Sequence, residues 1–292
     1  MKKIAVLVRK AGLSAAHLLG FLLGHLLYVF QRNRYRVAHL NINLAFPGES
    51  ARAVHQLTRA TIYETGKLLA ETVLFWLSPK HIADEFITSV HGGELVEQAR
   101  HAGKGIVLIC PHLGNWELLN FYASRLQHFV SYKPSSSRLL DAWLRSRRVR
   151  FGAIAAPLST QGLKALRKAL PEGGVALILP DQAPLAGQGR VQAPFFGIPA
   201  WTGTLVPRLL ADNVVAIFAF ARRLPDGQGF AIELVAPPDQ AIYSKDLEQA
   251  AAALNKGIEK CVLMCPEQYL WEYKRYKNTA YPKLYNRSRP LY

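Results

Sequence analysis

Short apolar runs, separated by stretches with helical spacing, restrict the fold of this chain more than any other feature. Each run is rich in Val, Ile, Leu, Phe and Ala. Four such runs occur, at residues 105–110, 174–179, 214–221 and 230–235. Runs of this length and composition are typical of buried strands in a parallel or mixed sheet, although periodicity alone leaves short buried helices open.

Helical candidates lie around these runs, where apolar residues recur at intervals of three and four. We expect helices at residues 49–77, 116–126, 139–150, 163–170, 202–211 and 245–264, and a short connection at residues 41–47. The alternation predicts an α/β fold with a central mixed or mostly parallel sheet flanked by helices. A chain of 292 residues is long enough to build one large domain of this kind.

The N-terminal segment at residues 11–30 contains no charged residue if its two histidines are neutral. Its length is that of a helix crossing a hydrocarbon core. Basic residues flank both ends, so the positive-inside rule gives no orientation, and an A-x-A-like signal cleavage site is missing. We expect an anchor helix with basic flanks at residues 1–36 and one main domain at residues 37–292. A buried or interfacial helix is the alternative.

The charge balance predicts an acidic partner for this chain. Lys and Arg number 36 against 20 Asp and Glu, a formal net charge of +16. Nucleic acid, anionic lipid and an acidic carrier protein all fit that charge. Three cysteines in a chain of this size indicate neither a disulfide framework nor, by their spacing, a zinc site. Cys110 closes an apolar run, so we expect inert packing there and no nucleophile.

The segment after the first apolar run contains the candidate catalytic residues. Pro111 ends the run and Asn115 suits the N-cap of the next helix, which places His112 in a loop at the carboxyl end of a strand. Glu117 falls in the first helical turn. From there its carboxylate can accept a hydrogen bond from one imidazole nitrogen and leave the other as a base. The alternative is an ordinary loop histidine followed by an acid at a helix start.

The residues between His112 and Glu117 complete the sequence HLGNWE. This sequence resembles the signature of the bacterial lipid A late acyltransferases, which belong to a wider group of H-x4-D/E acyltransferases that includes the glycerolipid acyltransferases. Further matches along the chain are Tyr132-Lys133-Pro134, an Arg-rich stretch ending at Phe151-Gly152, Asp181-Gln182, APFFG at residues 193–197, PEQYLW at residues 266–271 and YKRYK at residues 273–277. Lys133 departs from the family pattern, in which Arg is common, and this affects how an anionic group is held there.

The resemblance implies a glycerolipid-acyltransferase-like fold and a specific reaction. The donor is an acyl thioester on acyl carrier protein, or on coenzyme A, and the acceptor is a hydroxyl of a hydroxyacyl chain on an anionic, Kdo-bearing lipid A precursor. The site lies at the cytoplasmic face of the bacterial inner membrane. We expect no metal, no cofactor besides the acyl thioester co-substrate, and no nucleic-acid partner.

For the catalytic residues, the resemblance and the residues agree on His112 as the base and Glu117 as its orienting partner. Arg148 is expected to stabilise the oxyanion, with Arg150 as the alternative, unless these arginines form only a solvated basic helix face. The substrate-binding candidates are Asn115, Lys133, Arg150, Asp181, Gln182, Phe195, Phe196 and Arg275. Among them, Asp181 is expected to orient substrate, the two phenylalanines to line an acyl channel, and Arg275 to serve a headgroup region.

Three other functions remain open from the sequence. A metal-dependent hydrolase would use His112, Glu117 and Asp181 as ligands, but a second clustered His and an H-E-x-x-H motif are missing. A basic nucleic-acid or membrane-binding module without catalysis fits the charge, but no helix-turn-helix, RNP or P-loop signature is present. Within the acyltransferases, another glycolipid, a mannolipid or a glycerolipid is the alternative acceptor.

Overall fold

The computed structural model describes residues 2–126, 129–132, 142–143, 146–147, 152–157, 160–185, 187–210, 212–277, 279 and 284–285. Within this part of the chain, one large sheet forms the centre of the fold. From edge to edge it contains β1 (Ile87–His91), β9 (Phe230–Val235), β8 (Val214–Arg223), β2 (Gly105–Ile109), β5 (Val175–Ile178), β3 (Phe129–Tyr132) and β4 (Ile154–Pro157). Neighbouring strands are parallel except β8 and β9, which are antiparallel.

This mixed, mostly parallel sheet confirms the predicted α/β class. All four predicted strands are present, and the observed ends of β2, β5, β8 and β9 lie within two residues of the predicted ones. β2 and β5 are buried along their full length. A strand covered on both faces needs apolar side chains on both, which is why these segments appear in the sequence as continuous apolar runs.

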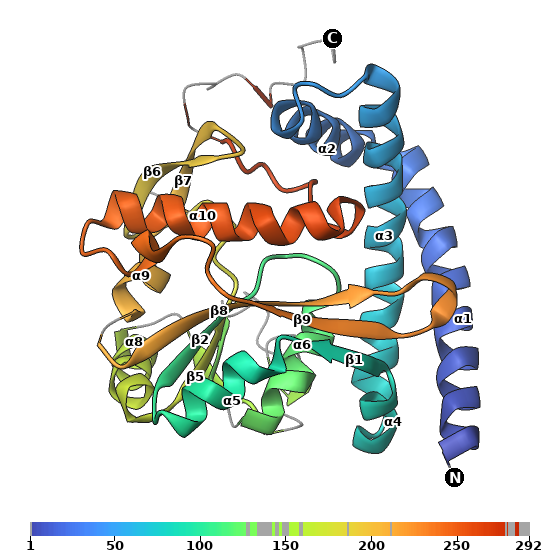
Figure 1. The fold of residues 1–292 in the computed structure, drawn as a ribbon. Coiled ribbons are helices and arrows are strands. Elements are labelled where there is room, and N and C mark those ends of the chain that lie inside the picture. The colour runs from blue at the N-terminus through green and yellow to red at the C-terminus, as the bar shows by residue number, and fades with distance from the viewer. Residues whose placement is uncertain are drawn as a thin grey trace.

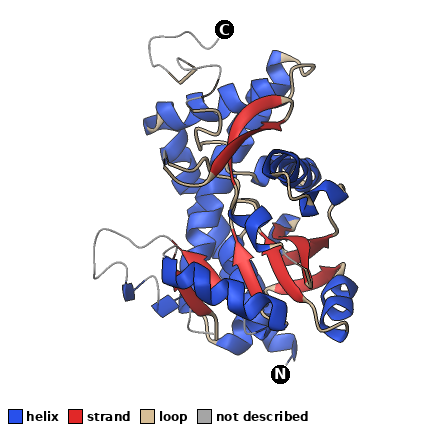
Figure 2. Cartoon of the chain, turned by 90° about the vertical axis from the view of Figure 1, so that its left-hand side faces the viewer, coloured by secondary structure: helices blue, strands red, loops and turns tan. Residues whose placement is uncertain are grey.

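Helices cover both faces of the sheet (Figures 1 and 2). One face packs against α4 (Lys80–Glu85), α5 (Gly93–His101) and α6 (Trp116–Ala123), and the other against α8 (Thr160–Ala169), α9 (Leu205–Leu209) and α10 (Leu247–Met264). The central strand β2 supplies both cores, Ile106 and Leu108 to the first and Val107 and Ile109 to the second. Short single-turn helices lie between these elements: η1 (Ser124–Leu126), η2 (Leu170–Glu172), η3 (Pro225–Gly227), η4 (Gln240–Tyr243) and η5 (Pro266–Gln268).

Three helices precede the sheet: α1 (Lys2–Phe30), α2 (Arg32–Ala45) and α3 (Ala51–Leu77). α1 and α3 lie side by side along most of their length (Figure 1). Glycines allow this approach, since a Cβ added to Gly66 of α3 would stand 2.2 Å from the backbone oxygen of Gly20 of α1. In the part of the chain with assigned structure, Arg9–Phe30 is the one stretch long and apolar enough to span a bilayer. The predicted N-terminal apolar helix is therefore confirmed as a helix, and it is docked on the fold.

Two predicted boundaries were wrong. Residues 41–47 were expected to connect two helices, but α2 continues to Ala45, and the Asn41 side chain donates 2.7 Å hydrogen bonds to the carbonyls of Trp271 and Tyr273. Residues 202–211 were expected to form one helix, but residues up to Gly203 belong to a strand. The spacing of apolar residues along the chain gives no information about these tertiary contacts. The predicted helix at residues 139–150 lies mostly outside the described residues.

A two-stranded antiparallel hairpin, β6 (Arg190–Phe195) and β7 (Ile198–Gly203), lies on the far side of α10 from the main sheet (Figure 1). The sequence pattern did not predict it, because prolines interrupt both strands. Its turn uses left-handed backbone at Phe196 and Gly197, with φ of 48° and 74°. The hairpin carries the predicted Phe-Phe-Gly motif toward the C-terminal segment.

Candidate active site

The candidate site forms where two parallel strands end next to each other. Ile109 and Ile178 are paired in register as the last residues of β2 and β5. His112 and Asp181 each stand three residues beyond these strand ends. Parallel pairing therefore brings together two side chains that are 69 residues apart in sequence. Carboxyl ends of strands are where sheets of this class place ligands and catalytic groups.

Asp181 holds His112 through two hydrogen bonds. Its Oδ1 is 2.6 Å from Nδ1 of the imidazole, and its Oδ2 accepts from the backbone N–H of His112 at 3.0 Å. Asp181 is 2% exposed. Burial by itself would raise the pKa of Asp181, but the positive charge available on His112 and these hydrogen bonds outweigh burial and lower that pKa. The carboxylate is therefore ionised and acts as an acceptor.

The second imidazole nitrogen faces a hydrogen-bond donor. The Gln182 side-chain nitrogen lies 3.2 Å from Nε2 of His112. With Asp181 accepting at Nδ1 and Gln182 donating at Nε2, the consistent neutral tautomer carries its proton on Nδ1. Trp116 packs edge-on against the imidazole ring, with a centroid separation of 5.1 Å. The lone pair of Nε2, which accepts from Gln182, is thus the basic position of this imidazole.

Backbone contacts fix the loop that carries His112. Gly114 has a φ of 60°, and a Cβ there would lie 2.0 Å from the carbonyl oxygen of Ala221 on β8, so this position requires glycine. The Asn115 N–H donates to the same carbonyl at 2.9 Å. The His112 carbonyl accepts from Leu270 N–H at 3.0 Å. Backbone hydrogen bonds with strand β8 and with the segment after α10 therefore hold the loop in place.

Asn115 is the N-cap of α6, as the sequence predicts. Its Oδ1 accepts from the backbone N–H of Leu118 at 3.1 Å, which satisfies one of the free donors at the helix start. Asn115 is fully buried. Its side chain therefore supports the loop from the interior of the protein. A substrate-binding role, as expected for it, would require the side chain to be exposed to the substrate, and it is buried.

Glu117 lies in the first turn of α6, but its observed contact differs from the expected one. Its Oε2 is 3.4 Å from the indole nitrogen of Trp76 on α3, and the residue is 7% exposed. Both imidazole nitrogens of His112 instead face Asp181 and Gln182. The contact with the imidazole that the sequence suggested for Glu117 is made by Asp181. The pairing of β2 with β5, which places Asp181 there, could not be predicted from local spacing.

The charge of Glu117 acts on Cys110, two residues before His112. This charge is one of the causes that raise the pKa of Cys110 well above the ordinary thiol value, after burial and the charge of Asp181. Cys110 is fully buried, and its sulfur contacts the Pro111 carbonyl at 3.4 Å. A buried thiol with a raised pKa is a poor nucleophile, as expected for this cysteine.

The aromatic candidates gather around the hairpin turn. Phe195 is fully buried and contacts the rings of Phe196, Tyr269 and Tyr276 at centroid separations of 5.0, 6.3 and 6.2 Å. Tyr269 links this cluster to the site: burial, followed by the charge of Asp181, raises its pKa well above the ordinary tyrosine value. The motif that suggested an acyl channel is thus linked through Tyr269 to Asp181.

Arg275, expected to serve a headgroup region, is 2% exposed. It donates to the Trp201 carbonyl at 2.6 Å and to Thr202 Oγ1 at 3.0 Å, and its guanidinium lies 4.9 Å from the Phe195 ring centroid. These contacts join the C-terminal segment to the hairpin. Its guanidinium is therefore buried, and contact with a headgroup would need exposure that this position does not give.

Three other candidates, Lys133, Arg148 and Arg150, lie outside the described residues. The described residues contain no group of three or more His, Cys, Asp or Glu side chains suited to hold a metal. Sequence reasoning missed Trp76, Glu71 and Arg223, which line or support the loop from α3 and β8. Trp76 belongs to the apolar pattern of α3 and gave no signal. Glu71 is a carboxylate on the buried face of that helix, and a charge at such a position is a signal of a buried ion pair.

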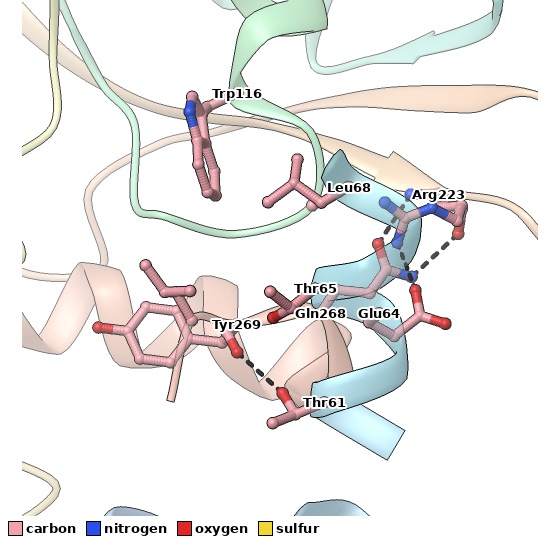
Figure 3. A pocket seen from close by; sticks show the side chains of 10 residues that line it. Thr61, Glu64, Thr65, Leu68, Trp116, Arg223, Gln268 and Tyr269 are labelled. Atoms are coloured by element: carbon pink, nitrogen blue, oxygen red, sulfur yellow. Dashed lines mark hydrogen bonds and ion pairs between the residues drawn. The ribbon is translucent and has the colours of Figure 1, made fainter. Parts of the chain in front are cut away.

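A small cavity of about 10 Å³, the space of one water molecule, lies beside the loop. It is lined by Thr61, Glu64, Thr65, Leu68, Gly114, Trp116, Arg223, Gln268, Tyr269 and Leu270. Figure 3 shows Trp116 on one side of it and the contact between Arg223 and Gln268 on the other. The Thr61 hydroxyl donates to the Tyr269 carbonyl at 2.9 Å (Figure 3). The C-terminal PEQYLW motif is therefore part of the support of the site.

Comparison with known proteins agrees with the resemblance carried by HLGNWE. Residues 3–278 match the family model for bacterial lipid A biosynthesis acyltransferases. The lipid A biosynthesis lauroyltransferase of Escherichia coli (strain K12) is 30% identical over 89% of this chain and 84% of that protein. The lipid A biosynthesis palmitoleoyltransferase of the same strain is 28% identical over the same shares, and a lipid A biosynthesis acyltransferase of Haemophilus influenzae is 26% identical over 92% of this chain and 86% of its own. The chain therefore belongs to the bacterial lipid A biosynthesis acyltransferase family.

Proposed function

We propose that this acyltransferase moves a fatty acyl chain from acyl carrier protein to a hydroxyl group on a hydroxyacyl chain of a Kdo-bearing lipid A precursor. The observation that carries the proposal is the His112–Asp181 pair, which leaves Nε2 as a base at the carboxyl ends of β2 and β5. The names of the relatives, a lauroyltransferase and a palmitoleoyltransferase, support a fatty acyl group as the transferred unit.

In the proposed reaction, Nε2 of His112 takes the proton of the acceptor hydroxyl while its oxygen attacks the thioester carbonyl. The tetrahedral intermediate collapses by breaking the carbon–sulfur bond, and the leaving thiolate takes the proton back from the imidazolium. Asp181 holds the imidazole in the required tautomer and stabilises its positive charge. Gln182, which lies at Nε2, releases that nitrogen when the acceptor hydroxyl arrives.

The remaining roles follow from charge and position. We assign Arg148, with Arg150 as the alternative, to the oxyanion, because a fixed cation stabilises the charge that develops there. Glu117 stays a catalytic candidate, as a second buried carboxylate, five residues after His112 in the HLGNWE sequence. Lys133 is assigned to an anionic group of either substrate. The net charge of +16 supports an acidic carrier protein and an anionic lipid as the two partners.

The acyl transfer assay that tests this function offers labelled acyl chains on acyl carrier protein or on coenzyme A. Acceptors in detergent micelles are a tetra-acylated, Kdo-bearing lipid A precursor and a lysophosphatidic acid. We expect product with the lipid A precursor and the carrier-protein donor. Product with lysophosphatidic acid alone would move the acceptor to the glycerolipids, and no product with any pair from folded protein would refute the proposal.

We further propose that residues 1–36 attach the catalytic domain, residues 37–292, to the cytoplasmic face of the inner membrane. Apolar side chains are exposed along α1, among them Leu18 at 65% and Phe30 at 75%. The neighbouring helix α3 adds Leu69, Val73 and Leu77, exposed by 49%, 52% and 68% and spaced four residues apart. Side chains at that spacing share one helix face. Exposed leucines on two packed helices support contact with lipid.

Replacing Leu69, Val73 and Leu77 together with serine is expected to weaken binding to vesicles of mixed zwitterionic and anionic lipid. The three changes remove exposed apolar area and leave the buried side of α3 intact. Flotation of wild type and variant in a density gradient measures the effect, with Leu263→Ser on α10, an equally exposed leucine at 59%, as the control. Equal flotation of the triple variant and wild type would exclude α3 from the lipid contact.

A further inference from the structure

A buried ion pair between α3 and β8 lies next to the catalytic loop and does not contact His112. Glu71 is fully buried, and Arg223 is 6% exposed. Arg223 donates from Nε to Oε1 and from Nη2 to Oε2 of Glu71, both at 2.5 Å. It also pairs through Nη1 with Glu64, two helical turns earlier on α3. A bidentate arginine–carboxylate pair fixes the direction as well as the distance between its elements.

The Glu71 carboxylate receives two more contacts, one from the catalytic loop and one from the N-terminal helix. The side-chain nitrogen of Asn115 donates to Oε2 at 3.1 Å. Nε2 of His17, on α1, lies 2.7 Å from Oε1. Glu71 is therefore the point at which α1, α3, β8 and the HLGNWE loop meet through side chains.

Gln268 connects the same pair to the loop backbone. Its side-chain amide accepts from the Arg223 N–H at 2.8 Å and donates to the Arg223 carbonyl at 3.0 Å (Figure 3). Its own carbonyl accepts from the Gly114 N–H at 3.1 Å. The loop is thus linked to the pair twice, through the Asn115 side chain and through Gly114. A shift of the pair would move the loop that carries His112.

The charge state of Glu71 fits this role. Burial would raise the pKa of Glu71, but the charge of Arg223 and the hydrogen bonds from Arg223, His17 and Asn115 outweigh burial and lower that pKa. The carboxylate is therefore ionised, and its two oxygens accept hydrogen bonds from Arg223 and Asn115. Buried ion pairs often add little net stability relative to apolar residues, and one of their attested uses is to specify a single geometry.

We propose that Glu71 and Arg223 are positioning residues for the HLGNWE loop, and that α1 belongs to the same catalytic scaffold through His17. The proposal rests on the acyl transfer function proposed above. It predicts that the N-terminal helix contributes to turnover even in detergent, where attachment to a bilayer is irrelevant. It also predicts that loss of the network changes turnover more than substrate binding, because Glu71 and Arg223 are buried and have no part in the proposed substrate contacts.

Glu71→Gln keeps the shape of the side chain and removes its charge, and its amide nitrogen would face a donor of Arg223 or Asn115. We expect kcat to fall roughly 10- to 100-fold, the effect of a small misplacement of a catalytic group, with KM changed by less than about twofold. Hydrogen exchange of the backbone amides of residues 112–118 is expected to accelerate. The matched control is Arg222→Gln, which breaks the Arg222–Glu233 pair (2.7 Å) on the neighbouring residue of β8 and should leave both readouts unchanged.

A pair of variants at His17 tests the contribution of α1. His17→Leu removes the contact with Glu71, and we expect a smaller fall in kcat with the same increase in loop exchange. His17→Gln keeps an N–H that can donate to Glu71, so it should restore most of the lost turnover. Rescue by glutamine separates a hydrogen-bonding role from simple packing of α1.

Wild-type kcat and wild-type loop exchange in folded Glu71→Gln and His17→Leu protein would overturn the proposal. If Glu71→Gln does not fold, the two His17 variants decide the question, because His17 lies at the edge of the network. Absence of product from wild type and Arg222→Gln alike would refute the proposed function. In that case the exchange of residues 112–118 still decides whether the network holds the loop.

Discussion

Alanine in place of His112 is expected to reduce the rate of acyl transfer by roughly 10²- to 10⁴-fold, the range that a general base contributes. Nε2 of His112 is the basic nitrogen proposed to take the hydroxyl proton, and without the imidazole Asp181 has no base to orient. The fold should persist, because His112 lies in a loop whose backbone is held by Asp181, Leu270 and neighbouring glycine contacts.

The measurement is the initial rate with saturating donor and acceptor, together with the thermal unfolding midpoint. His91→Ala is the matched control, since His91 also forms a histidine–carboxylate pair, with Glu233 at 3.0 Å, but at an exposed position on β1. It should retain full activity. Unfolded His112→Ala protein would show that this histidine is structural, and an active, folded variant would remove it from the mechanism.

Asparagine in place of Asp181 is expected to have the second large effect, a loss of kcat of roughly 10³- to 10⁴-fold, as for a histidine whose orienting carboxylate is neutralised. The carboxylate accepts from Nδ1 and from the backbone N–H of His112 at once. Asparagine has one acceptor oxygen, so one of these bonds is lost or the imidazole adopts the tautomer with its proton on Nε2. Loss of the Nδ1 bond or the change of tautomer removes the oriented base, and in every case the neutral amide no longer supplies the charge that stabilises the imidazolium.

Comparison of Asp181→Asn with Glu117→Gln tests which carboxylate orients the histidine. The geometry predicts that the Asp181 change lowers kcat at least as much as the Glu117 change, with KM nearly constant for Asp181. A full loss in Glu117→Gln combined with normal turnover in Asp181→Asn would return the orienting role to Glu117. Both variants need thermal unfolding curves, because both side chains are buried.

The elements that could be predicted from the sequence are those in which local pattern and burial agree. β2 and β5 are buried on both faces, so each is apolar throughout, and α3 and α10 repeat apolar residues with the period of a helix buried on one side. The N-cap role of Asn115 could be predicted because a helix cap depends only on residues next to it in the sequence. The hairpin at residues 190–203 was missed, since its prolines contradict a strand in any local reading.

By itself the sequence predicted the strands β2, β5, β8 and β9, the long helices α3 and α10, the loop position of His112 and a resemblance whose family the comparisons confirm. All of these depend on residues close together in the chain. Tertiary structure alone decided that Asp181 faces His112, that Glu117 turns to Trp76, and that Glu71 and Arg223 support the loop. The packing of strands and of α3 brings these groups together across 41 to 152 residues of sequence. The residues next to each side chain in the sequence do not indicate which distant partner it will contact.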